Sequence, residues 1–299
     1  MGEYMFRKNK KSILKKIVFG SSTGMIIAFM IVFIPCLMVL DFFGADITGS
    51  ADMDGEVLTD DYVVNNSEYA PLYRTVLTEK LHQGLGYVPL TRIVYLYQSN
   101  KSYYELYDDN INKETNKLKP ITTVCNEAKY SFLSACKENE ISKSNQSKSV
   151  QAKPFGKPID FNKMYNVTSI FMEQRIVFGK YDVHNAWDFS APDHTPVYST
   201  CNGKVIWVSF TQNLNVTNTS ASGGNQIKIS CPIGDKEYIV WYAHLFPGSN
   251  LVSVGDSVNI GQQVAEVGTT GYSTGSHLHY QVQYKGKNVD GMSLINFSK

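Results

Sequence analysis

Residues 268–284 read GTTGYSTGSHLHYQVQY, and this stretch decides the fold. From His277 onward polar and apolar side chains alternate, which is the period-2 pattern of a β-strand with one buried face. His277 and His279 are therefore expected on the same side of the strand, separated by roughly 6.6 Å at a rise of about 3.3 Å per residue. At that spacing one imidazole can bind a metal ion while the other reaches a ligand of the ion. The Gly-, Ser- and Thr-rich residues before them predict a loop.

Two further histidine motifs precede this strand. The motif HNAWD runs from His184 to Asp188, and both side chains are expected on one face of a strand. Imidazole nitrogen and carboxylate oxygen are both good zinc donors. The motif WYAHL places His244 in an apolar, aromatic run that also reads as a strand. Five of the six histidines lie beyond residue 180, and His194, in the turn sequence DHTP, is expected to be solvated.

The order H-x-x-x-D, W-Y-x-H-L and G-Y-S-T-G-x-H-L-H resembles the lysostaphin-type, or LytM-like, zinc metallopeptidases, which cut peptide bonds in bacterial peptidoglycan. The resemblance covers roughly residues 165–296. Two positions depart from the family pattern, because Ala186 stands where glycine is usual and Ser276 where proline is common. Shorter matching segments lie at 188–192, 195–198, 202–205, 223–227, 254–256 and 261–262.

The resemblance implies a fold and a metal site. Residues 156–299 are expected to form a mostly antiparallel β domain of the lysostaphin-type peptidase fold, similar to the duplicated hybrid motif, and their succession of strand and turn signals agrees. His184, Asp188 and His279 are expected to hold one zinc ion per chain, with an open fourth position. The apolar face of the sheet is expected from Val205, Trp207, Ile227, Ile229, Val240 and Tyr242.

The resemblance also implies roles for the two remaining histidines of the motifs. His277 is expected to act as the general base, and His244 to stabilise the oxyanion or share the proton transfer. Tyr181 is a weaker candidate for the role of His244. The alternative is that His244 only packs against a metal ligand or orients it.

The N-terminal part runs from basic to apolar to acidic. Lys and Arg are frequent in the tail 1–16, and the 24 residues 17–40 are uncharged. At about 1.5 Å per residue this run spans the roughly 30 Å of a hydrocarbon core with some tilt, which predicts a transmembrane helix. The stalk 41–67 has seven acidic residues and no basic one, so the N-terminus is expected in the cytoplasm and the rest outside. The alternative is a cleaved signal peptide, whose apolar region would be shorter.

Two segments connect this anchor to the β domain. Residues 68–140 are expected to form a small, mainly helical extracytoplasmic region, because apolar residues recur at helical spacing within 73–81 and 121–137. We expect a spacer or a module that binds a protein partner, and a second wall hydrolase is the alternative. The polar residues 141–155 lack a hydrophobic period and predict a flexible linker.

The composition excludes few classes of protein, but it bears on nucleic-acid binding and on disulfide formation. The net charge is +1, and neither a nucleotide-binding glycine pattern nor a basic patch interleaved with aromatic residues is present, so a nucleic-acid partner is not expected. Antiparallel pairing of 203–209 with 225–231 would place Cys201 opposite Cys231. Outside the membrane these two can form a disulfide, and two reduced thiols are the alternative.

The sequence thus predicts a single-pass protein of a bacterial cell membrane, expected to be Gram-positive, with a zinc endopeptidase outside that hydrolyses peptide cross-links of peptidoglycan. Its expected partners are peptidoglycan peptide, the membrane through 17–40 and a protein through 68–140. A catalytically silent relative that binds wall peptide or activates another hydrolase is the alternative. A third interpretation, compatible with the first, is a component of an envelope-spanning transfer or secretion machine. The cleaved bond, the biological process and the oligomeric state stay open.

Overall fold

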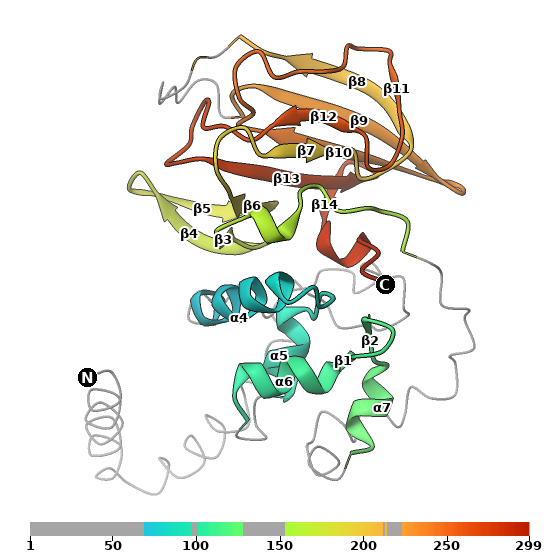
Figure 1. The fold of residues 1–299 in the computed structure, drawn as a ribbon. Helices are drawn as coiled ribbons and strands as arrows, with labels where there is room; N and C mark the ends of the chain where they lie inside the picture. The colour runs from blue at the N-terminus through green and yellow to red at the C-terminus, as the bar shows by residue number, and fades with distance from the viewer. Residues whose placement is uncertain (1–68, 97–100, 128–152, 212, 214–222, 299) are drawn as a thin grey trace, which may run out of the picture. The chain divides into compact units, whose positions relative to one another are not determined.

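The computed structural model describes residues 69–96, 101–127, 153–211, 213 and 223–298 (Figure 1). Every described residue belongs to one compact unit, Ser50–Lys299. The predicted span 17–40, the stalk 41–67 and most of the linker 141–155 lie outside the described residues. Within the described part of the chain, no helix has the length and apolar character needed to cross a membrane.

An eight-stranded sheet organises the C-terminal domain, in the order β11-β8-β9-β10-β13-β6-β3 with β14 paired to β13. Every neighbouring pair is antiparallel, which confirms the predicted mostly antiparallel β domain. The central strand β13 begins at His277, as the alternation predicts. The strands are β3 (Asn166–Ser169), β6 (Trp187–Ser190), β8 (Gly203–Ser209), β9 (Gln226–Ile233), β10 (Lys236–Ala243), β11 (Ser257–Val258), β13 (His277–Tyr284) and β14 (Lys287–Val289).

Two small antiparallel sheets accompany the large one. The first is a hairpin of β4 (Glu173–Val177) and β5 (Lys180–His184), and the second pairs β7 (Pro196–Tyr198) with β12 (Gln263–Glu266). Two short 3₁₀ helices flank the domain, η3 (Phe161–Lys163) and η4 (Met292–Leu294). The β4–β5 hairpin places His184 next to the large sheet. Strand β5 ends at this residue, and β6 of the large sheet starts three residues later.

The segment before the β domain is mainly helical in its described part. Its elements are α4 (Ala70–His82), α5 (Leu90–Leu96), α6 (Tyr103–Asn110), β1 (Ile111–Asn112), β2 (Lys117–Leu118) and α7 (Ile121–Cys125). Helix α4 carries Pro71 in its first turn, where the missing N–H costs nothing, and it contains the stretch 73–81 that the spacing predicts as helical. Helix α6 starts at a capping box of Ser102 and Glu105. The predicted helix 121–137 is described only as far as α7.

Helix α4 packs directly against the edge of the large sheet, beside β3 (Figure 1). The Val167 amide of β3 donates a hydrogen bond of 2.9 Å to Thr78 Oγ1 of the helix. His82 Nε2 lies 3.1 Å from the Met164 carbonyl, immediately before β3. Because β3 is the last strand in the sheet, the helix covers an edge that would otherwise present unpaired backbone groups.

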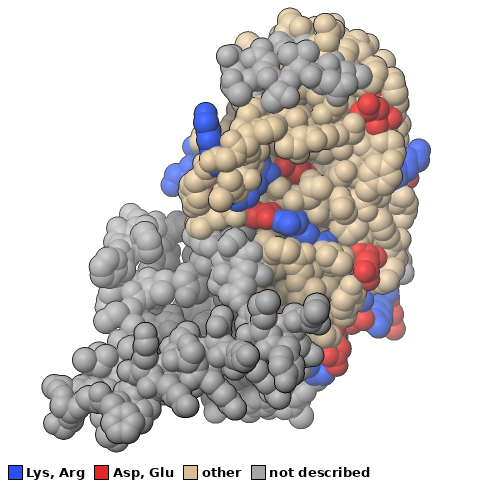
Figure 2. Space-filling model, turned by 90° about the vertical axis from the view of Figure 1, so that its left-hand side faces the viewer, with Lys and Arg blue, Asp and Glu red and all other residues tan. Residues whose placement is uncertain are grey.

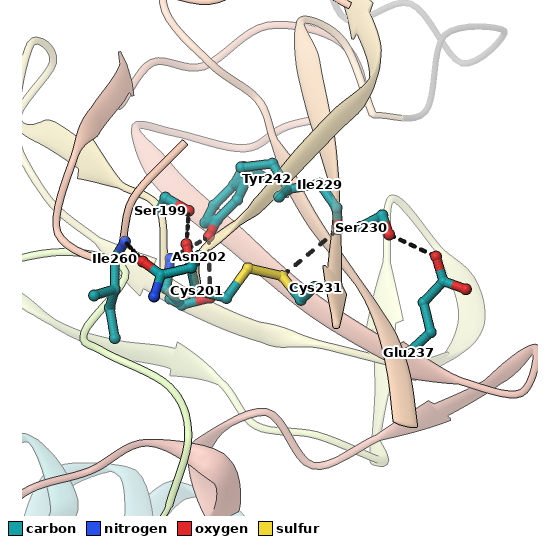
Figure 3. The surroundings of a disulfide bond; sticks show 10 residues. Ser199, Cys201, Asn202, Ile229, Ser230, Cys231, Glu237, Tyr242 and Ile260 are labelled. Carbon is teal, nitrogen blue, oxygen red and sulfur yellow. Dashed lines mark hydrogen bonds between the residues drawn. A yellow bond between two sulfur atoms is a disulfide. The ribbon is translucent and has the colours of Figure 1, made fainter. Parts of the chain in front are cut away.

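A disulfide joins Cys201 to Cys231, with both side chains fully buried and the Cα atoms 5.9 Å apart (Figure 3). At the start of β8 the predicted register is wrong by two residues, because Val205 faces Ile229, and a shift of two keeps the side chains of this part of the strand on their predicted faces. Cys201 lies in the turn before β8, so it reaches Cys231 without being its strand partner. Closing a loop of this sequence separation, 30 residues, stabilises a fold by about 3–4 kcal/mol in the chain-entropy model.

One predicted core residue is exposed. Val205 is buried, whereas Trp207 is 52% exposed. The register of β8 against β9 shifts between these two residues, so the strict alternation that predicts Trp207 on the inner face is broken there. The other four residues of the predicted apolar face, Ile227, Ile229, Val240 and Tyr242, are fully buried.

Candidate metal centre

Three side chains of the histidine motifs converge at one point. Asp188 Oδ1 lies 3.1 Å from His184 Nε2 and 3.0 Å from His279 Nδ1, and the two nitrogens are 3.4 Å apart. These three residues form a cluster that could hold a metal ion. His184 and Asp188 are buried, and His279 is half-buried.

Three different strands supply these side chains. His184 is the last residue of β5, Asp188 lies in β6 and His279 in β13, where its Cα is paired with that of Asp188. The prediction that His184 and Asp188 share one face of a single strand is wrong, because the chain leaves the β4–β5 hairpin between them and enters the large sheet. Ala186, where the family usually has glycine, is buried and does not have a positive φ, so the added methyl group needs no strained backbone.

Each of the three groups is oriented by a second hydrogen bond. His184 Nδ1 lies 3.3 Å from the Ile170 carbonyl, and His279 Nε2 lies 3.3 Å from Gln281 Oε1. Both outer partners are acceptors, so they suit the tautomer with its proton on the outer nitrogen, which leaves the inner nitrogen a lone pair for a metal ion. Arg175 Nη1 donates a 2.9 Å bond to Asp188 Oδ2, which leaves Oδ1 facing the histidines.

The electrostatics of the cluster favour an ionised Asp188 and disfavour the protonated form of His184. Burial alone would raise the pKa of Asp188, but the nearby His184 and His277 outweigh it and hold the pKa well below its usual value. Burial lowers the pKa of His184, against the opposing charge of Asp188. A metal ion requires this combination, because a protonated imidazole has no lone pair to give.

The donor set fits zinc. In a tetrahedral site with metal–ligand distances of about 2.0–2.1 Å, ligand atoms lie roughly 3.3 Å from one another. The three separations in the cluster, 3.0, 3.1 and 3.4 Å, are close to that value. Two imidazoles and one carboxylate also match the three-ligand pattern of catalytic zinc sites, which keep a fourth position open.

The two other motif histidines lie beside the cluster. His277 Nε2 is 3.7 Å from Asp188 Oδ1, and the ring centroid of His244 is 4.6 Å from that of His277. His277 Nδ1 lies 2.8 Å from the Gly275 carbonyl, and His244 Nδ1 lies 2.7 Å from the Thr270 carbonyl. Because carbonyls only accept, both Nδ1 atoms carry protons, and each Nε2 is left with a lone pair.

His244 is held in an unusual conformation. It follows the last residue of β10 and has a φ of 60°, in the left-handed region that non-glycine residues rarely adopt. Burial, together with the neighbouring His277 and His279, lowers its pKa to about 3, so the ring is neutral at pH 7. Such backbone strain persists only where the surroundings fix it, and here the His244 amide bonds the Gly223 carbonyl at 2.9 Å.

Neither His194 nor Tyr181 is a member of this cluster. His194 is exposed in its turn, as predicted, where its Nδ1 is 2.7 Å from Glu266 Oε2. Tyr181, the weaker candidate for the role of His244, lies on β5 with 67% of its surface exposed.

The groups that orient the motif histidines lie outside the three sequence motifs. Arg175 reaches Asp188 from β4, thirteen residues earlier in the chain. Thr270 fixes His244 through its carbonyl, and its hydroxyl donates to the Leu245 carbonyl at 3.0 Å. Gln281 lies two residues after His279 on the same face of β13. Its Nε2 donates a 2.6 Å hydrogen bond to Asn288 Oδ1. Of Arg175, Thr270 and Gln281, only Gln281 is indicated by the sequence, because the alternation of 277–284 places it on the same face as His277 and His279.

Among the described residues, acidic and basic side chains are interspersed on the face drawn in Figure 2.

Comparison with known proteins places this site in a family. Residues 182–291 match the model of Peptidase family M23. Peptidoglycan DD-endopeptidase ShyB of Vibrio cholerae is 37% identical over 138 residues, which cover 45% of this chain and 29% of that protein. An uncharacterized metalloprotease of Buchnera aphidicola is 31% identical over 147 residues, covering 48% and 35%. The matches thus span about a third of the length of these relatives.

A solved structure of a zinc containing peptidase from Vibrio cholerae is 34% identical and covers 47% of this chain and 40% of that one. Its TM-score is 0.39, which is too low to support an inference about the fold. The sequence match covers all five motif residues, His184, Asp188, His244, His277 and His279. Residues 182–291 are therefore a domain of peptidase family M23, in agreement with the lysostaphin-type resemblance of the sequence motifs.

Proposed function

We propose that the chain is a zinc metalloendopeptidase that hydrolyses peptide cross-links of bacterial peptidoglycan outside the cell membrane. The observation that carries the proposal is the convergence of three oriented ligand atoms, with Nε2 of His277 and the ring of His244 beside them. The curated relative named a peptidoglycan DD-endopeptidase supports the choice of substrate.

His184, Asp188 and His279 would hold the zinc ion. Zinc in such a site supplies Lewis acidity, which polarises the scissile carbonyl and makes a water molecule more acidic. The chain contributes the positioning of this group, because Arg175 fixes the carboxylate and Gln281 and Ile170 fix the imidazoles. Preorganised ligands of this kind need no rearrangement during the reaction.

His277 is placed to accept the proton of the attacking water. Its Nδ1 proton is directed to the Gly275 carbonyl, so its Nε2 lone pair is free and faces Asp188 across 3.7 Å. Its side chain is only 13% exposed, which limits competition from bulk water. A general base must lie within hydrogen-bond reach of the proton that it takes, and the position of Nε2 beside the ligand cluster meets this condition.

His244 is the second histidine available for proton transfer or oxyanion stabilisation. A neutral ring with its proton on Nδ1 cannot donate from Nε2, so the lowered pKa argues against a resting oxyanion donor. The same lowered pKa makes His244 a weak base, so His277 comes first as the general base.

Digestion of purified cell walls tests this function. The zinc-loaded fragment Ser50–Lys299, which is one compact unit, should release peptides with new amine termini that mass spectrometry identifies. The identity of these termini also gives the cleaved bond. If the zinc-loaded fragment binds wall peptides but releases none, the catalytically silent alternative is correct.

The proposed membrane topology has its own test. A reporter before Met1 should stay protected from an added protease in intact cells, whereas one after Lys299 should be accessible, because the basic tail 1–16 is expected inside. Protease accessibility before and after cell disruption measures both. An accessible N-terminal reporter, or a shortened chain in the medium, would contradict the uncleaved anchor at 17–40.

A further inference from the structure

An ion pair joins helix α4 to β4, in the hairpin that carries the proposed ligand His184. Its two residues, Arg74 and Glu173, are 99 residues apart in the chain. Arg74 Nη1 of the helix bonds Glu173 Oε1 at the start of β4. The carboxyl side chain is 8% exposed and the guanidinium 23% exposed, so solvent screens this pair only in part. Lys80, on the same helix, pairs instead with Asp108 of α6, inside the helical segment.

Glu173 in turn fixes the loop that orients a proposed metal ligand. Its second oxygen, Oε2, accepts a 2.9 Å hydrogen bond from the Ile170 amide. The carbonyl of the same Ile170 faces His184 Nδ1 at 3.3 Å. Glu173 is also the β-partner of His184 in the β4–β5 hairpin, and the Met172 amide donates to the His184 carbonyl at 2.6 Å.

The position of α4 does not depend on this ion pair. The Val167 amide bonds Thr78, about one turn further along the helix than Arg74. Asp290, in the turn after β14, accepts a 2.9 Å bond from Tyr87 and a 2.7 Å bond from Trp187 Nε1. Trp187 directly precedes Asp188. The helical segment is thus anchored to the sheet at several points, which makes Arg74 a fixed group beside the loop 170–173.

We propose that Arg74 is a positioning residue of the metal centre, acting through Glu173 and the loop 170–173 on the ring of His184. This inference rests on the proposed zinc site. Groups that orient a metal-ligating histidine affect metal binding, because they set its ring angle and tautomer. Without Arg74, Glu173 is a buried carboxylate without its cation, which favours a rearrangement of the loop toward solvent. The helical segment then contributes to zinc affinity as well as to architecture.

The test is the zinc affinity of full-length Arg74→Gln, measured by competition with a chromophoric chelator. We expect a loss of about 10-fold, the low end of the effect of such orienting groups, because Arg74 acts through two intervening contacts. Arg74→Lys, which keeps the charge, should recover most of the affinity. With cobalt(II) in place of zinc, the ligand-field spectrum of Arg74→Gln should be shifted from that of the parent, since it reports the geometry of the ligands.

The matched control is Lys80→Gln, which breaks the other partly buried ion pair of the same helix. It should reduce thermal stability much as Arg74→Gln does and leave zinc affinity and the cobalt spectrum unchanged. If Arg74 acts through Glu173, the double variant Arg74→Gln/Glu173→Gln should bind zinc no more weakly than Glu173→Gln alone.

The outcomes separate this inference from the proposed function. A parent protein that binds no zinc would refute both. A parent that binds zinc, with unchanged affinity and cobalt spectrum in Arg74→Gln, would refute the positioning role alone. Equal losses of zinc affinity in Lys80→Gln and Arg74→Gln would refute it as well, because they would show only a general loosening of the helix.

Discussion

His277→Ala should lower the rate of wall digestion by a factor of roughly 100 to 1,000 and keep about one zinc per chain. The imidazole is not among the three converging ligand atoms, so its removal leaves the donor set intact. What is lost is the Nε2 lone pair beside Asp188, held in place by the Nδ1 bond to Gly275. Peptide release from purified walls and metal analysis of the same preparation measure the two quantities together.

The matched control for this variant is His194→Ala. His194 is an exposed histidine outside the cluster, so its replacement should change neither activity nor zinc content. His244→Ala should resemble His277→Ala, since both rings offer Nε2 to the same reaction. A zinc-replete His277→Ala protein as active as the parent would show that the proton is taken by another group.

Asp188→Ala should abolish stoichiometric zinc binding and, with it, wall digestion. The variant removes one of three ligands and the only negative charge among them, and it leaves Arg175 without one of its two carboxylate partners. Placing that cation beside the two histidines further disfavours a divalent ion. Metal analysis after dialysis against trace zinc gives the occupancy, which should fall from about one per chain to near zero.

Asp182→Ala separates the two effects. Asp182 is the other carboxylate bound to Arg175, at 3.0 Å, but it is 45% exposed and lies outside the cluster. Its removal disturbs the arginine without removing a ligand, so zinc occupancy should stay near one. Retention of stoichiometric zinc in Asp188→Ala would mean that the ligand set is assigned incorrectly.

The sequence predicts the central part of the site because the relevant information is local. The alternation after Ser276 correctly places His277 and His279 on one face of β13, and it does so from adjacent residues alone. The pairing of His184 with Asp188 was predicted for the wrong reason. The two residues meet because the chain passes from one sheet to another between them, which a five-residue pattern cannot distinguish from a continuous strand.

The rest of the site depends on contacts between distant segments. Nothing in the neighbourhood of Arg175 indicates that it binds Asp188, since an arginine on a short strand is normally solvated. The exposure of Trp207 follows from a shift in strand register, which depends on the partner strand β9. The docking of α4 on β3 depends on a hydroxyl at Thr78 that meets an amide 89 residues away.

The covering of β3 by α4 bears on which part of the chain can be produced as a folded fragment. The segment that matches the family begins at residue 182, and β3 with its helical cover lies before it. A fragment that carried only the family segment would leave the outer edge of β6 without its neighbouring strand. Such an unpaired edge is a template for pairing with another chain. In this chain the folding unit is therefore larger than the family segment.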